Sequence, residues 1–129
     1  MNSLRLIIIN MKDYMFADAA ALALQNDRGN DFTVEKVYEP EEIEPYVKAA
    51  YAVVMEVTCT GPYTLEERLE LTGRLRTENS DCKVVFLVDE NTDAELARRV
   101  RQAKKEGLID NFIYGSVSAA YLSAVIDTL

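Results

Sequence analysis

Three acidic side chains could do chemistry, because each lies at or just after a short apolar run of the chain. They are Asp13, Glu56 and Asp89, and Glu90 follows the last of them. If the apolar runs are parallel strands, their carboxyl ends meet at one edge of a sheet, where two or three carboxylates could hold a cation. The simpler interpretation is a row of solvated acids. We therefore expect no metal, with Asp13, Glu56 and Asp89 as the candidates for a non-standard site.

The residue types do not support nucleophilic or zinc-dependent catalysis. The chain has two cysteines, Cys59 and Cys82, and no histidine. Without histidine or a Cys-x-x-Cys spacing the cysteines cannot form an ordinary zinc site, and neither a Ser-His nor a Cys-His pair can be assembled. We expect two reduced thiols and a protein that is not an enzyme.

Composition and charge exclude several classes of partner. The chain has 129 residues, the size of one domain, with 22 acidic and 14 basic residues and a net charge of −8. Such a charge repels nucleic acid and anionic lipid. The longest apolar runs, residues 6–9 and 84–88, are far shorter than the roughly 20 residues that span a bilayer. We expect one cytoplasmic domain over residues 1–129, with no membrane segment and no nucleic-acid partner.

The elements that must position these side chains follow a regular alternation. Runs that are apolar or rich in β-branched residues predict strands, and the amphipathic segments between them predict helices. The predicted strands cover residues 4–9, 32–38, 52–57, 84–88 and 111–114. The predicted helices cover residues 14–25 and 41–50 and then begin at the caps Thr64, Thr92 and Ser116, the fourth ending at Gly107. Pro45 must lie in the first turn of the second helix or kink it.

Strands that alternate with helices in so short a chain predict one α/β domain. Right-handed crossovers place a five-stranded parallel sheet between two helical layers, a doubly wound three-layer (βα)5 arrangement with the strand order 2-1-3-4-5. Ligands bind such sheets at the carboxyl ends of the strands. Function is therefore inferred from the residues at these ends, Asn10, Glu56, Val88 and Tyr114.

Two segments near the predicted carboxyl edge suggest a family. Glu56 lies at the end of the third strand ahead of the loop 57–61, and residues 103–116 hold Gly107 and Asp110 before the fifth strand. In these features, and over essentially its full length, the chain resembles the receiver domain of bacterial two-component response regulators. The resemblance implies a CheY-like, flavodoxin-like fold with Glu56 at the place of the phosphoacceptor aspartate.

The reactive positions of that family are all replaced. The resemblance implies that Asn10 and Met11 stand at the pair of acids that holds Mg²⁺, Val88 at the Ser or Thr that contacts the phosphoryl group, and Tyr114 at the lysine. Without Mg²⁺ and the lysine, charge on a transferred phosphoryl group goes uncompensated. We expect no phosphotransfer and no cofactor. Glu56 could imitate a phosphorylated aspartate, with less charge.

The fourth predicted helix carries a basic face that could be an interface. In receivers this helix, the fifth strand and the last helix often form the dimer or partner surface. The resemblance implies a homodimer or partner contact in which the basic residues meet Asp110 or Asp127 of a second copy. A solvated helix face is the other interpretation. The candidate interface residues are Arg98, Arg101, Lys105, Asp110 and Tyr121.

We therefore expect a phosphorylation-independent receiver-like signalling module, a pseudo-receiver, that acts through protein–protein contacts. Its partner would be another protein or an output domain, and residues 1–129 could be the N-terminal domain of a longer protein. The alternative is a sensor that binds a small ligand or a cation in the pocket left between Asn10, Glu56, Val88 and Tyr114. The Val and Tyr side chains would make that pocket small and dry, which favours the first hypothesis.

Overall fold

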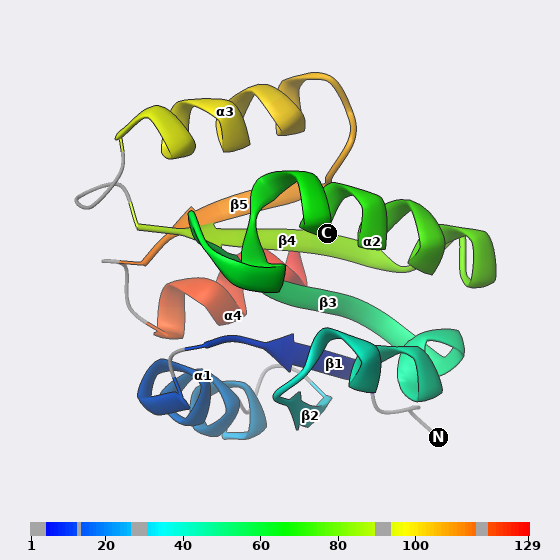
Figure 1. The fold of residues 1–129 in the computed structure, drawn as a ribbon. Coiled ribbons are helices and arrows are strands. Elements are labelled where there is room, and N and C mark those ends of the chain that lie inside the picture. Colours follow the sequence, from blue (N-terminus) through cyan, green and yellow to red (C-terminus); the bar gives the residue numbers. More distant parts are fainter. Residues whose placement is uncertain (1–4, 13, 27–30, 90–93, 116–118) are drawn as a thin grey trace.

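The chain forms a single parallel sheet in the computed structural model, which describes all residues except 1–4, 13, 27–30, 90–93 and 116–118. The strands are β1 (Arg5–Asn10), β2 (Phe32–Val37), β3 (Ala50–Val57), β4 (Lys83–Val88) and β5 (Asn111–Tyr114). All neighbours are parallel, and the order is β2-β1-β3-β4-β5 (Figure 1). This confirms the predicted α/β fold class and strand order.

Two helical layers cover the sheet. The α-helices are α1 (Tyr14–Gln25), α2 (Leu65–Glu78), α3 (Ala94–Lys105) and α4 (Ala119–Asp127), and the 3₁₀ segments are η1 (Pro40–Ala49) and η2 (Gly61–Tyr63). Buried residues of η1, α2 and α3 form one cluster with one face of the sheet, and those of α1 and α4 form a second cluster with the other face. The fold is therefore three-layered, as expected.

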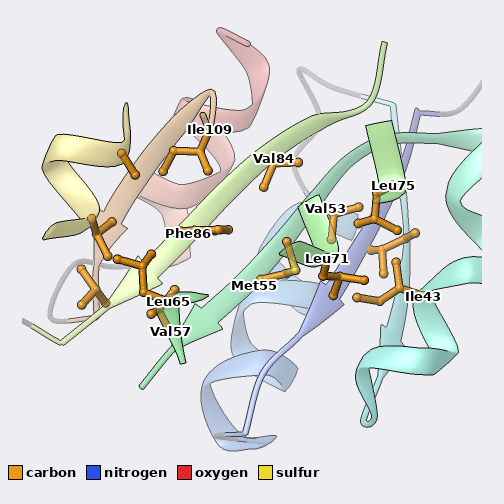
Figure 2. Packing of buried hydrophobic residues seen from close by; sticks show 14 of the residues in the cluster. Ile43, Val53, Met55, Val57, Leu65, Leu71, Leu75, Val84, Phe86 and Ile109 are labelled. Carbon is orange, nitrogen blue, oxygen red and sulfur yellow. The ribbon is translucent and has the colours of Figure 1, made fainter. Parts of the chain in front are cut away.

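The central strands are buried on both faces, which explains their continuous apolar runs. Along β3, Val53 and Met55 contact the cluster under α2, whereas Val54 belongs to the cluster under α1 and α4. Figure 2 shows the first cluster, where Met55 of β3 lies between its neighbour Phe86 of β4 and Leu71 of α2. Alternate residues of one strand thus pack against both helical layers. A change in the packing of either layer therefore acts on the same strand.

The second predicted helix is a 3₁₀ helix instead of an α-helix. η1 contains Pro45 in its interior and buries only Pro40, Ile43 and Val47. Proline has no backbone N–H and clashes with the carbonyl four residues earlier, so α-helical pairing is unfavourable there. The tighter 3₁₀ turn avoids that pairing. β3 consequently begins at Ala50, two residues before the predicted start of this strand.

Helix ends agree with the predicted signals where the structure describes them. The Thr64 hydroxyl accepts the N–H of Glu67 at 3.4 Å and begins α2. Gly107, with a φ of 78°, ends the turn after α3. The predicted caps Asp13, Thr92 and Ser116 lie outside the described residues. Within the described part of the chain, no helix combines the length and the hydropathy that a membrane span requires.

The two cysteines differ sharply in environment, which predicts a difference in reactivity. Cys59 is exposed and Cys82 is buried, and burial raises the pKa of the Cys82 thiol to about 11. Only thiolates attack disulfide reagents, so with an aromatic disulfide in the native protein we expect Cys59 to react at least about a hundredfold faster than Cys82. The release of the aromatic thiol measures both rates. A Cys59→Ser variant should lack the fast phase, and equal rates in the wild type would contradict the placement of Cys82.

Candidate functional site

The carboxyl edge of the sheet brings the predicted site positions together. Asn10 ends β1, Glu56 lies one residue before the end of β3, and Val88 and Tyr114 end β4 and β5. In the ladder Val88 is paired with Tyr114. The edge is therefore assembled as the strand order requires. What the side chains do there differs from the expectation.

A buried arginine that the sequence interpretation missed occupies the middle of this edge. Arg68 projects from α2 and has no exposed surface. Its Nη1 donates to Asn10 Oδ1 at 2.6 Å and its Nη2 to the Asn10 carbonyl at 3.3 Å. Its Nε donates to the Glu56 carbonyl at 2.9 Å. One side chain thus ties α2 to the ends of both β1 and β3.

Asn10 is fully buried, and its amide suits these surroundings in a way that a carboxylate would not. Its Nδ2 donates to the carbonyls of Val37 and Tyr38, at 3.0 and 3.1 Å, while its Oδ1 accepts from Arg68. An ionised aspartate can only accept hydrogen bonds. It would therefore place its oxygens against two carbonyl oxygens. The amide joins the end of β2 to the same network.

The charge of Arg68 is enclosed by neutral acceptors. Its three hydrogen bonds go to an amide oxygen and two backbone carbonyls. Burial lowers the pKa of Arg68 to about 10, an effect that the nearby Tyr63 and Glu56 side chains partly oppose. A pKa of about 10 keeps the guanidinium charged at neutral pH. The ring of Tyr63 lies 5.0 Å from the guanidinium carbon and adds a cation–π contact. The carboxyl edge therefore contains a built-in cation.

The Glu56 carboxylate binds the segment between β1 and α1. Its Oε1 accepts the backbone N–H of Lys12 at 2.6 Å, two residues before α1 begins. A carboxylate is favourable near a helix N-terminus, where backbone N–H groups carry partial positive charge. Glu56 is thus held at both ends, by Arg68 at its carbonyl and by Lys12 at its carboxylate.

The four residues predicted to line a pocket at this edge, Asn10, Glu56, Val88 and Tyr114, differ in how much surface they expose. Asn10 and Val88 have no exposed surface, and Met11 is nearly as buried. The Tyr114 hydroxyl accepts from Arg101 at 2.9 Å. A hollow at this edge includes Glu56, and its lining residues are Glu56, Val57, Thr58, Cys59, Thr60, Asp89 and Leu96.

The candidate cation ligands are only partly brought together. Glu56 and Asp89 both border that hollow, whereas Asp13 lies outside the described residues. Among the residues whose placement is described, no three His, Cys, Asp or Glu side chains form a cluster that could hold a metal ion. One oxygen of Glu56 already accepts from the Lys12 N–H.

The candidate interface residues separate into two groups. Arg98, Arg101, Lys105 and Tyr121 are all exposed, with Arg98 paired to Glu95 of its own helix. Asp110 is used inside the chain, where its Oδ2 accepts from Arg76 at 2.6 Å and from the Val84 N–H at 2.8 Å.

Asp127 is also engaged within the chain. Its Oδ1 pairs with Arg5 at 3.1 Å. The two acids that were expected to meet a basic helix of a second copy therefore already have partners of their own. The exposed basic residues of α3 remain as the interface candidates.

The molecule has the fold of response-regulator receiver domains. A response regulator from Thermotoga maritima is similar, with a TM-score of 0.75 and 19% identity, covering 98% of this chain and 97% of that chain. An orphan response regulator of H. pylori has a TM-score of 0.69 and 16% identity, covering 96% and 94%. A response regulator from Burkholderia pseudomallei with a phosphorylated aspartic acid has a TM-score of 0.69 and 18% identity, covering 95% and 66%.

Identities this low establish the fold and nothing finer. No family model and no curated protein matches the chain. The receiver fold is therefore the class that the structure defines.

Replacing Arg68 should destabilise the fold, because three oxygens at the carboxyl edge would lose their donor. Leaving buried polar groups without a partner costs on the order of 1–3 kcal/mol each when they stay dry. We expect Arg68→Met to lower the free energy of unfolding by about 2–4 kcal/mol, measured by urea denaturation.

The matched control is Arg74→Met on the same helix. Arg74 is exposed and reaches only Glu44, at 3.8 Å. Its replacement should change the free energy of unfolding by less than about 0.5 kcal/mol. Equal effects of the two substitutions would show that Arg68 contributes no more than a surface arginine.

Proposed function

We propose that the protein is a receiver-like regulatory module that works through protein–protein contacts and takes up no phosphoryl group. The observation that carries this proposal is the Arg68–Asn10 pair. Asn10, which the receiver resemblance aligns with one of the two acids that hold Mg²⁺, carries a neutral amide, and its oxygen accepts a hydrogen bond from the Arg68 guanidinium.

The chemistry of phosphoryl transfer explains why this arrangement is unsuited to it. Charge develops on the oxygens of the transferred group and must be balanced by cations that face them. The guanidinium of Arg68 donates inward to Asn10 and to the Glu56 carbonyl. Val88 has no hydroxyl to offer, and the Tyr114 hydroxyl accepts from Arg101. These contacts support a module without an enzymatic step.

The position of Glu56 supports a module with one resting state. Its carboxylate oxygen is bound by the Lys12 N–H, so the side chain spans from β3 to the start of α1. A phosphorylated aspartate would offer more charge and more oxygens than this single carboxylate. In the proposed module Glu56 fastens the loop after β1 permanently, and signalling follows from the abundance or the placement of the protein.

The contact surface in this proposal comprises α3, β5 and α4. Arg98, Arg101 and Lys105 on α3 and Tyr121 on α4 are exposed there. Basic and tyrosine side chains are well suited to a specific contact with a protein partner or an output domain. One protein of similar fold is an orphan response regulator, so the receiver fold occurs in a regulator of that description.

The sensor hypothesis receives less support. It needs surface from Asn10 and Val88, and both are fully buried. The neighbouring hollow is bordered by Glu56 and Asp89 and is open to water. Without converging donors and acceptors such a hollow offers a ligand little specificity.

Incubation with acetyl phosphate and Mg²⁺ tests the proposal. We expect the mass of the intact protein to remain unchanged, because neither the metal ligands nor the compensating cation are in place. Mass spectrometry under denaturing conditions measures the result. A mass increase equal to one phosphoryl group would overturn the proposal.

Two matched samples make a negative result informative. The response regulator from Burkholderia pseudomallei, whose structure holds a phosphorylated aspartic acid, serves as the positive control. A Glu56→Asp variant restores the residue type of the phosphoacceptor while leaving Asn10 and Arg68 in place. We expect it to stay unmodified as well, because the defect lies in the surrounding charges.

A further inference from the structure

The basic residues of α3 are concentrated on one helix of an acidic protein. Ala94–Lys105 contains five basic residues and one acidic residue, in a chain whose net charge is −8. Arg98, Arg101, Lys104 and Lys105 line one open groove with Gln102. We call these four side chains the basic surface. Leu108, with 44% of its surface exposed, lies three residues beyond the end of the helix.

The two acids that were expected to face this surface in a second copy are already bound within the chain. Asp110 is bound by Arg76 and by the Val84 N–H, and Asp127 is bound by Arg5. Two α3 helices facing each other in a symmetric dimer would therefore bring basic side chains against basic side chains. Like charges placed together oppose association.

A complementary surface lies elsewhere on the same molecule. Glu39, Glu41, Glu42 and Glu44 are exposed at and within η1, and we call them the acidic surface. Glu42 accepts the backbone N–H groups of Tyr38 and Glu39, and Glu44 makes a loose exposed pair with Arg74 at 3.8 Å, a kind of contact that contributes little. Two exposed tyrosines accompany them, Tyr38 just before η1 and Tyr46 within it.

Apolar anchors of this kind are common at protein interfaces. Each surface thus pairs its charges with exposed apolar area: leucine beside the basic surface, and tyrosine beside the acidic one.

The two surfaces lie at opposite ends of one helical layer. η1 contacts β1 and β2, whereas α3 contacts β4 and β5. Both belong to the layer that also contains α2. In Figure 1, α3 lies at the top of the sheet and η1, drawn in teal, lies at the bottom. Within one molecule the basic and acidic surfaces are too far apart to bind each other. In two molecules the basic surface of one can bind the acidic surface of the other.

We propose that the basic surface of one copy binds the acidic surface of a second copy, so that the protein associates head to tail. The proposal rests on the proposed function in taking α3 as the contact surface, and it names the partner as the chain itself. A head-to-tail contact leaves one unused surface at each end of the pair. It therefore adds further copies, in an open row or in a ring, where a symmetric contact would stop at two.

Light scattering coupled to sedimentation tests the proposal with the wild-type chain. We expect its weight-average mass to pass that of a dimer as the concentration rises from about 10 μM to about 1 mM. The contacts are charged and lie at the surface, so the association should weaken about tenfold or more in about 1 M salt. A wild-type chain that stays monomeric, or that saturates as a dimer, overturns the proposal.

Charge reversal separates head-to-tail association from other contacts. Arg98→Glu with Arg101→Glu should abolish association, and so should Glu41→Lys with Glu44→Lys at the other end of the molecule. The chain that carries all four substitutions should associate again, because its two surfaces are complementary once more. Recovery in this quadruple variant also rules out misfolding as the cause of the losses.

Each contrary result has a definite meaning. If reversal at η1 leaves association unchanged, the contact is not with the acidic surface. If the quadruple variant remains monomeric while both double variants do so, the two surfaces do not bind each other. Either result overturns head-to-tail association. The proposed lack of phosphotransfer is judged separately, by the mass of the protein after acetyl phosphate treatment.

Discussion

A single buried cation organises the carboxyl edge of this sheet. Burying the guanidinium of Arg68 costs free energy, and it is tolerated because three oxygens with fixed positions accept its hydrogen bonds. Those oxygens belong to two strands that are neighbours only because of the fold. The same requirement explains why Asn10, with one acceptor and two donors, stands at the end of β1. α2, β1, β2 and β3 are thereby coupled at one point, and the loop to η2 is positioned by Tyr63 over the guanidinium.

The fold could be predicted from the sequence because its signals are local and repeated. Strands buried on both faces need continuous apolar runs, such as residues 84–88, and helices that cover a sheet need one apolar stripe. Alternation of the two then leaves few topologies. The prediction failed at η1, where the interior Pro45 favours 3₁₀ pairing over the α-helical pairing that the apolar spacing suggested. In this segment the single proline determines the type of helix, although the spacing of the apolar residues is typical of an α-helix.

The sequence predicted which strand ends meet at the carboxyl edge of the sheet. It did not predict Arg68 or the hydrogen bonds that the side chains make there. Arg68 lies on the same stripe as Leu65, Leu71 and Leu75, which are buried, and that placement was the available signal. A charged residue on an amphipathic helix is ordinarily solvated, so its acceptors are needed to recognise it as buried. These acceptors are 12 and 58 residues away in the chain. The partners of Asp110 and Asp127 are also distant in sequence, at 34 and 122 residues, and local patterns carry no information about them.

The two hydrogen bonds that Asn10 donates determine which substitutions this edge of the sheet tolerates. An aspartate at position 10 would set a carboxylate against Arg68, but it would also place an oxygen against the carbonyls of Val37 and Tyr38. Removal of Arg68 alone would leave the Asn10 side-chain oxygen and the Glu56 carbonyl without the hydrogen bonds that Arg68 donates. Each single substitution therefore leaves polar groups of the other residue without a partner or against a like charge. The effects of changing Asn10 and Arg68 are consequently non-additive, because the two residues act as one unit.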